Sequence, residues 1–179
     1  RFTFLMQEIS TGFFRSAQIL PFLHIVGVIL LISLQIVALV FVFAFKNGDL
    51  RENLLRFFAI FRLLFPLFLA LIIFTSFSLA NGEQLKFVDP MIEGIIYTQC
   101  AVVVFLLLNF IYICYQISRV FKMCDCKCGI FGVDEIKFND KCADEINDSI
   151  VIIGHYFVPL NLCASFLAVF LGVAIRVFL

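Results

Sequence analysis

The chain has 179 residues, of which 63% are hydrophobic, and it carries 13 basic and 13 acidic side chains. Its mean hydropathy of +1.10 is far above that of soluble domains, which are roughly half apolar. The composition therefore predicts an integral membrane protein. The balanced charge argues against nucleic-acid binding, which requires a basic surface.

Four apolar stretches predict four transmembrane helices, at residues 18–45, 54–80, 91–121 and 149–178. Each is longer than the roughly 20 residues that a helix needs to cross the hydrocarbon core of a bilayer. Short polar connections favour antiparallel neighbours, so the predicted fold class is all-α, an antiparallel bundle of four transmembrane helices in one domain. We expect residues 1–17, which mix phenylalanine with charged residues, to lie at the membrane interface, a disordered tail being the alternative.

Lysine and arginine residues concentrate at one end of the predicted bundle, around the loop at residues 122–148. That end holds Lys46, Arg51, Arg56, Arg119, Lys122, Lys127, Lys137 and Lys141, and the other end holds Arg1, Arg15, Lys86 and Arg176. The positive-inside rule therefore places the loop in the cytoplasm and both termini outside. We expect a bacterial inner membrane, and thiols that stay reduced on the loop side.

The loop at 122–148 contains four of the seven cysteines, namely Cys124, Cys126, Cys128 and Cys142. Four thiolates are the ligand number of a tetrahedral Zn²⁺ ion, and they also suit Cu(I). This spacing, with three closely spaced cysteines and one distant partner, differs from paired C-x-x-C zinc motifs. Cysteines that accept lipid and thiols without a special role are the alternatives.

The two histidines, His24 and His155, lie about 9 Å from opposite membrane faces, because their helices run antiparallel. The two rings should be about 20 Å apart along the membrane normal, too far to ligate one haem iron. His24 shares its depth with polar residues of the second and third spans: Thr75, Ser76, Ser78, Tyr97, Thr98 and Gln99. We predict a cofactor-binding or proton-handling layer of His24, Tyr97 and Gln99; a histidine that is merely hydrogen-bonded is the alternative. For His155 we expect a structural role.

Two further groups of polar residues lie inside the predicted spans. Gln35, Asn109 and Asn161 should meet near the midplane, where amides commonly join helices through hydrogen bonds, a substrate site being the alternative. Arg62 lies about two turns into the second span. Its side chain should either snorkel to the interface or pair inside the bundle.

Several motifs together suggest a family. The first span opens with Leu23-His24-Ile25-Val26-Gly27. In the second span, Arg56 and Arg62 precede Pro66, and Thr75 lies near the end. The third span ends with the segment from Tyr115 to Arg119. This arrangement resembles the CopD-like and HemJ-like integral membrane proteins, which are four-helix units. The resemblance implies copper handling or haem-dependent protoporphyrinogen oxidation, with haem b or copper as the cofactor and His24 as its ligand.

Three functions follow as expectations. The first is a membrane protein associated with haem, copper or membrane redox chemistry, with His24 as the candidate ligand. The second is a noncatalytic subunit or scaffold whose phenylalanine-rich helices pack against partner subunits or further copies of the chain. The third, a small transporter or channel, is disfavoured because no inverted repeat is visible and only the second span carries a charge away from its ends.

Overall fold

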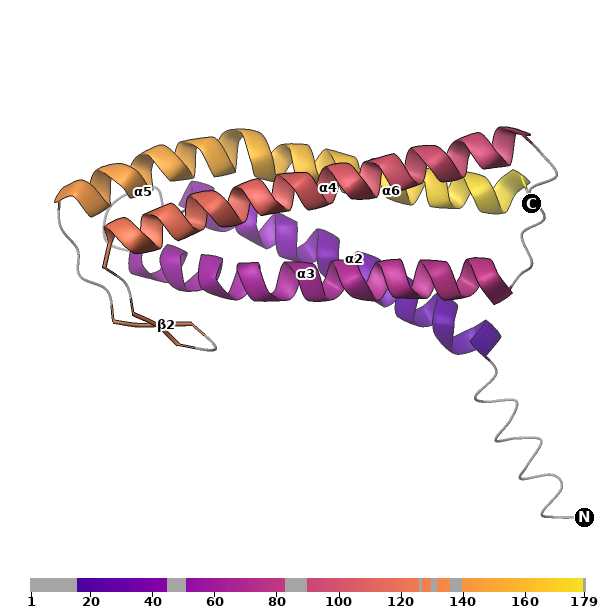
Figure 1. Cartoon of the computed structure of the whole chain (residues 1–179), viewed down its shortest axis with the longest axis horizontal. Helices are drawn as coiled ribbons and strands as arrows, with labels where there is room; N and C mark the ends of the chain where they lie inside the picture. Colours follow the sequence, from indigo (N-terminus) through magenta and orange to yellow (C-terminus); the bar gives the residue numbers. More distant parts are fainter. Residues whose placement is uncertain are drawn as a thin grey trace, which may run out of the picture.

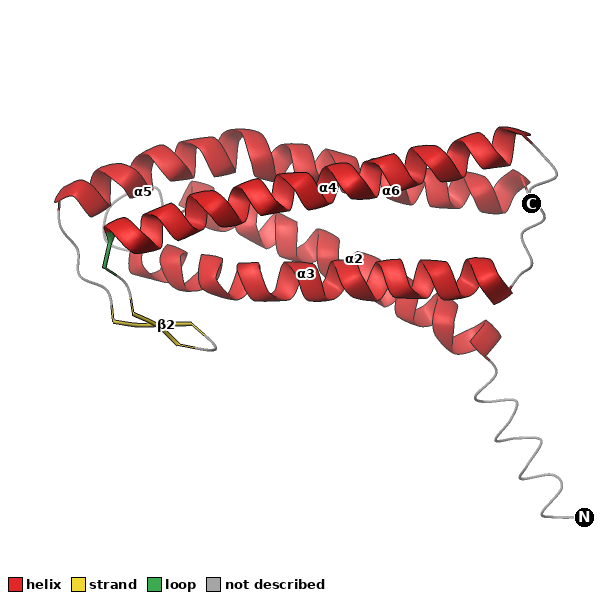
Figure 2. Cartoon of the chain, in the orientation of Figure 1, coloured by secondary structure: helices red, strands yellow, loops and turns green. Residues whose placement is uncertain are grey.

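The computed structural model describes residues 16–44, 51–82, 90–125, 127–129, 132–135 and 140–178. Long helices lie along one another, and a small antiparallel strand pair lies at one end of them (Figures 1 and 2). In chain order the elements are α2 (Ser16–Ala44), α3 (Arg51–Gly82), α4 (Pro90–Met123), β1 (Lys127–Gly129), β2 (Gly132–Glu135), α5 (Asp140–Ile152), the π-helix η1 (Ile153–Phe157) and α6 (Val158–Phe178). The predicted interfacial segment 1–17 lies almost wholly outside the described residues.

Four stretches of these helices are long and apolar enough to cross a membrane: Ile19–Ala44, Glu52–Ser78, Pro90–Met123 and Asp140–Ala174. The predicted all-α bundle of four membrane-spanning helices is therefore confirmed, and the protein is an integral membrane protein. Along the bundle, α2 packs against α3 and α4 packs against α6. Buried residues of both pairs belong to one hydrophobic core.

The fourth helix begins at Asp140 and not at Ser149, so the predicted loop 122–148 ends in a helix. The segment is amphipathic: Cys142, Ile146 and Ser149 are buried on one face, whereas Asp144 and Asp148 are exposed. This helical period is present in the sequence. The segment has no uninterrupted apolar run, which is the feature of helices surrounded by lipid, and the sequence therefore predicted a later start.

A π-helical turn, η1, joins α5 to α6. The N–H of Val158 bonds to the carbonyl of Ile153, five residues earlier, and Pro159 follows directly. A proline ring clashes with the carbonyl four residues before it in a regular α-helix, here that of His155, and the wider turn relieves this. The helix also passes very close to α2 at this point, because a Cβ on Gly154 would overlap the side chain of Val42.

The hydrophobic core is concentrated at the loop end of the bundle. Phe61 has no exposed surface, and its ring contacts Phe57, Phe58, Phe65 and Phe110, with centroids 5.4 to 6.4 Å apart. Further buried members come from α4, α5 and η1, among them Ile113, Ile117, Ile146 and Ile153. Aromatic side chains bury large areas and interact through their rings, so the contact of Phe61 and Phe65 with Phe110 fixes the arrangement of α3 against α4.

Candidate functional site

His24 on α2 forms hydrogen bonds with the end of α3. Its Nδ1 lies 2.9 Å from Thr75 Oγ1 and 3.3 Å from Ser76 Oγ. The sequence predicted that His24 meets Thr75 and Ser76, and these two contacts are confirmed. The contact is possible because Gly27, one turn after His24, is buried and allows α2 to approach Leu71 and Ile72 of α3.

The surroundings of Thr75 favour a hydrogen on Nδ1 of His24. The Thr75 hydroxyl lies 2.8 Å from the carbonyl oxygen of Leu71 and 3.0 Å from that of Ile72. These oxygens only accept, so the single hydroxyl proton is used there and Thr75 Oγ1 accepts from His24. A neutral His24 that donates from Nδ1 in this way is the Nδ1–H tautomer.

The α4 members of the predicted layer are two exposed residues, Tyr97 and Thr98, and Gln99, which lies toward α6. Tyr97 is 67% exposed, and Thr98 donates to the carbonyl of Gly94 in its own helix, at 2.8 Å. The Gln99 amide nitrogen lies 3.6 Å from the place that a Cβ on Gly172 of α6 would occupy. The structure thus brings His24 together with Thr75 and Ser76, and it places Gln99 at the α4–α6 contact.

His155 and His24 lie at different levels of the bundle, as predicted. The exposed His155 ring contacts Phe43 edge to face, with centroids 5.3 Å apart. Phe43 is near the end of α2, about 28 Å along the helix axis from His24 at 1.5 Å per residue. One haem iron therefore cannot be ligated by both rings.

A chain of hydrogen bonds joins α2, α6 and α4 in the middle of the bundle. Asn109 Nδ2 donates to Asn161 Oδ1 at 2.9 Å, and Gln35 Nε2 donates to Ser165 Oγ at 2.9 Å. Ser165 in turn donates to the carbonyl of Asn161, at 2.9 Å. The predicted meeting of the three amides is confirmed, with Ser165 as a linker that we did not predict; its position one turn after Asn161 on the same helix face is the signal in the sequence.

The cysteines of the loop differ from the prediction of four free thiolates. Cys124 and Cys142 form a disulfide and both are fully buried. A disulfide leaves no thiolate at either position, so the predicted four-thiolate zinc or copper site of Cys124, Cys126, Cys128 and Cys142 is not available in this state. Cys126 and the side chain of Cys128 lie outside the described residues.

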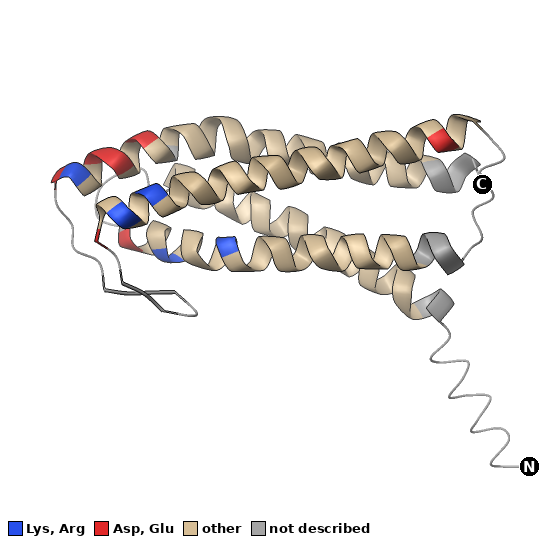
Figure 3. Ribbon diagram, in the orientation of Figure 1, with Lys and Arg blue, Asp and Glu red and all other residues tan. Residues whose placement is uncertain are grey.

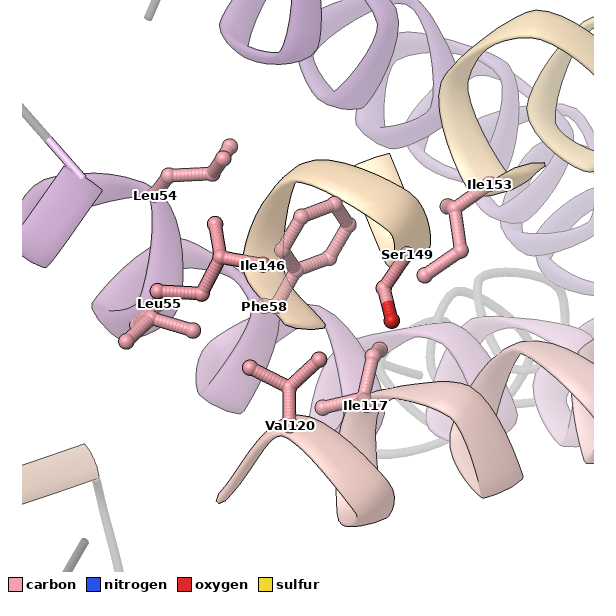
Figure 4. Close-up of a pocket in the computed structure, with 8 residues that line it drawn as sticks. All are labelled: Leu54, Leu55, Phe58, Ile117, Val120, Ile146, Ser149 and Ile153. Carbon is pink, nitrogen blue, oxygen red and sulfur yellow. The ribbon is translucent and has the colours of Figure 1, made fainter. Parts of the chain in front are cut away.

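A small cavity of about 20 Å³ lies where α3, α4, α5 and η1 meet (Figure 4). Its lining is apolar except for one hydroxyl group, and consists of Leu54, Leu55, Phe58, Ile117, Val120, Ile146, Ser149 and Ile153. This volume is sufficient for about one water molecule. The cavity is therefore a packing defect of the core and is far too small for a porphyrin.

The fold and these contacts define an integral membrane protein built as a four-helix bundle with a polar layer at His24. Searches with this chain found no matching family model, no matching curated protein and no matching solved structure.

Proposed function

We propose that this protein is a haem- or copper-associated membrane protein in which His24 ligates the metal. The observation that carries the proposal is the hydrogen bond from His24 Nδ1 to Thr75 Oγ1. Metal-ligating histidines commonly donate their second ring nitrogen to a neighbouring acceptor, which fixes the tautomer and the ring orientation and makes the ligand more basic.

The surroundings of His24 favour haem b over copper. The layer offers one imidazole and two hydroxyl groups, whereas copper sites in proteins use several nitrogen or sulfur donors. Haem iron needs only one axial histidine, because the porphyrin supplies the other nitrogen ligands. Phe74 and Phe77 flank Thr75 and Ser76, and both rings are more than 60% exposed, so apolar surface suited to a porphyrin lies beside the layer.

The proposal is tested by purifying the protein from cells supplied with haem precursor and copper, then recording the Soret absorption and the metal content. We expect one haem per chain, loss of haem in His24→Ala and full retention in the control His155→Ala. Thr75→Val keeps the shape of the side chain but removes the hydroxyl oxygen that accepts the hydrogen bond from His24. Haem binding should weaken about 10- to 100-fold, as it does when a group that orients a metal ligand is removed. Colourless protein without copper overturns the proposal, and an undiminished cofactor content in His24→Ala excludes this residue.

A second candidate function is a noncatalytic subunit that packs against partner helices or further copies of the chain. The observation in its favour is that the half of the bundle around His24 exposes large aromatic side chains on three helices, including Phe22, Phe74 and Phe170. Size-exclusion chromatography with light scattering, on protein extracted in mild detergent, tests this candidate. A monodisperse monomer with no co-purifying chain argues against it.

We further propose a bacterial inner membrane as the location, with the loop end in the cytoplasm. The excess of lysine and arginine at that end supports this orientation. The Cys124–Cys142 disulfide favours the opposite one, because disulfides persist mainly in oxidising compartments. The labelling experiment of the next subsection determines the side directly.

A further inference from the structure

The helices are too long for the bilayer alone. The 32 residues of α3 and the 34 residues of α4 span about 48 and 51 Å, and the continuous helix from Asp140 to Phe178 spans about 58 Å. A hydrocarbon core is about 30 Å thick, and a bilayer with its headgroups about 40–45 Å. Part of the bundle therefore lies outside the membrane, and the surface of the helices indicates which part.

Exposed side chains change character at one level of the bundle. From Leu63 to Phe77 on α3, from Cys100 to Ile111 on α4 and from Leu160 to Val173 on α6, every exposed residue is apolar or a cysteine. Toward the loop the exposed residues are mostly polar: Glu52, Asn53, Arg56, Ser118, Arg119, Lys122, Asp125, Asp140, Lys141, Asp144, Asn147 and Asp148. Among large apolar side chains there, Ile60, Met123 and Val151 are exposed.

Figure 3 shows the same division in the part of the chain drawn in colour. Basic and acidic residues gather at the α5 end, and the helices are uncharged beyond it except for one acidic residue near the start of α4. Lipid tails are compatible with apolar side chains, whereas charged side chains are stable in water. The charged end of the bundle therefore has the surface of a protein in water.

Aromatic and basic side chains mark the level of the change. Tyr112, Tyr115 and Tyr156 are 39%, 59% and 67% exposed, and the Tyr112 ring stacks on Phe157 with centroids 4.3 Å apart, which places α4 and η1 at the same depth. His155 is exposed beside them. Tyrosines at such levels favour the membrane–water interface, where an apolar ring and a polar hydroxyl are both accommodated.

Arg62 on α3 adds independent support. The neighbouring rings of Phe61 and Phe65 both contact Phe110, but the Arg62 guanidinium lies over the ring of Phe121, 5.5 Å from its centroid. Phe121 is about 16 Å further along α4 toward the loop. The Arg62 side chain thus extends out of the apolar region, which is the snorkelling that the sequence allowed.

We propose that phospholipid headgroups meet the bundle at a belt formed by Tyr112, Tyr115, His155 and Tyr156, past which the Arg62 side chain extends toward the loop. The helices on the loop side of this belt, together with the Cys124–Cys142 disulfide, form a cap that stands outside the bilayer. The cap comprises the start of α3, the end of α4 and all of α5. From the belt at Tyr115 to Pro90, α4 spans about 38 Å, which matches a bilayer including part of its headgroups.

Two positions on α4 test the belt, because both are exposed and lie on opposite sides of it. Ser118→Cys and Leu108→Cys are made in a chain whose cysteines other than Cys124 and Cys142 are replaced by alanine. After reconstitution into phosphatidylglycerol-containing vesicles, a spin label at each position reports its accessibility to oxygen and to a water-soluble nickel chelate. The label at 118 should be in water and the label at 108 in hydrocarbon, and Asp144→Cys with Phe166→Cys should repeat this contrast.

The second measurement uses sealed membrane vesicles prepared from cells in two forms, right-side-out and inside-out. A membrane-impermeant maleimide should react at least tenfold faster with the cysteine at position 118 than with that at position 108. The reaction at position 118 should occur in only one of the two vesicle forms. A gel shift after reduction confirms that each variant has kept its disulfide. Hydrocarbon-like accessibility at position 118, or equal reaction rates at the two positions, overturns the belt. Haem or copper content does not enter the measurement, so the result is independent of the proposed function.

Discussion

The cap and the His24 end of the bundle are held together in different ways. In the cap, Phe58, Ile117 and Ile146 pack into a core that includes the Cys124–Cys142 disulfide, and an ion pair of 2.9 Å joins Arg119 on α4 to Glu145 on α5. Around His24 fewer side chains are buried, and hydrogen bonds connect neighbouring helices. Water forces the cap to bury its apolar surface, whereas lipid tails offer no such driving force.

The two ends of the bundle differ in how easily they can accept a ligand. A ligand that binds in the cap has to displace tightly packed side chains. At the His24 end it has to displace only lipid, and regions with few buried contacts rearrange at low cost. The candidate ligand His24 therefore lies in the half of the molecule that is better suited to accept a cofactor or a partner helix.

The largest effect is expected from truncating the cap core. Phe58→Ala removes a buried ring that contacts those of Phe57 and Phe61 and should lower the free energy of unfolding by about 3–5 kcal/mol. The matched control is Phe74→Ala on the same helix, where the ring is 66% exposed and the change should stay within about 0.5 kcal/mol. Unfolding in mixed micelles, followed by circular dichroism, measures both; equal losses would contradict the contrast between the two ends.

Removing the disulfide should have the next largest effect. The bond closes a loop with a sequence separation of 18, and the chain-entropy estimate for such a loop is about 3 kcal/mol. Cys124→Ser combined with Cys142→Ser should lower the melting temperature, and a reducing agent should lower that of the native protein similarly. Cys163→Ala, at an exposed position on α6, is the control and should melt like the native chain. A melting temperature that is insensitive to reduction would show that the cap holds together without this bond.

The membrane bundle could be predicted from the sequence because its signal is continuous. Uninterrupted apolar runs identify all four helices, and the antiparallel order follows from the short connections. The meeting of His24 with Thr75 was also predictable, because depth along a helix follows from counting residues. By contrast, the start of the fourth helix at Asp140 was placed too late, since the cap helix is amphipathic and lacks an apolar run.

Other features depend on the direction in which a side chain points from its helix. Both Tyr97 and Gln99 share the depth of His24, but depth does not specify the direction in which a side chain points, and Gln99 lies at α6. The pairing of Cys124 with Cys142 could not be derived from spacing alone. It arises because the amphipathic period of α5 turns Cys142 inward, next to the end of α4.

The smallest effect is expected at the midplane, where Asn109 donates to Asn161 between α4 and α6. Asn109→Leu and Asn161→Leu should each lower the free energy of unfolding by about 0.6–1.7 kcal/mol, the range measured for hydrogen bonds between membrane helices. The double variant should cost less than the sum, because neither amide is then left with an unpaired partner. The difference is the coupling energy of a double-mutant cycle.

Thr98→Val supplies the control for this cycle. Among the described residues the Thr98 hydroxyl bonds within α4, at Gly94, so the effect of Thr98→Val should add to that of Asn161→Leu without coupling. Coupling of zero between Asn109 and Asn161 would mean that packing holds the lipid-embedded helices, as it does in the cap. A clear coupling would mean that polar contacts join helices where lipid removes the hydrophobic driving force, and the His24–Thr75 bond would then hold α2 to α3 in the same way.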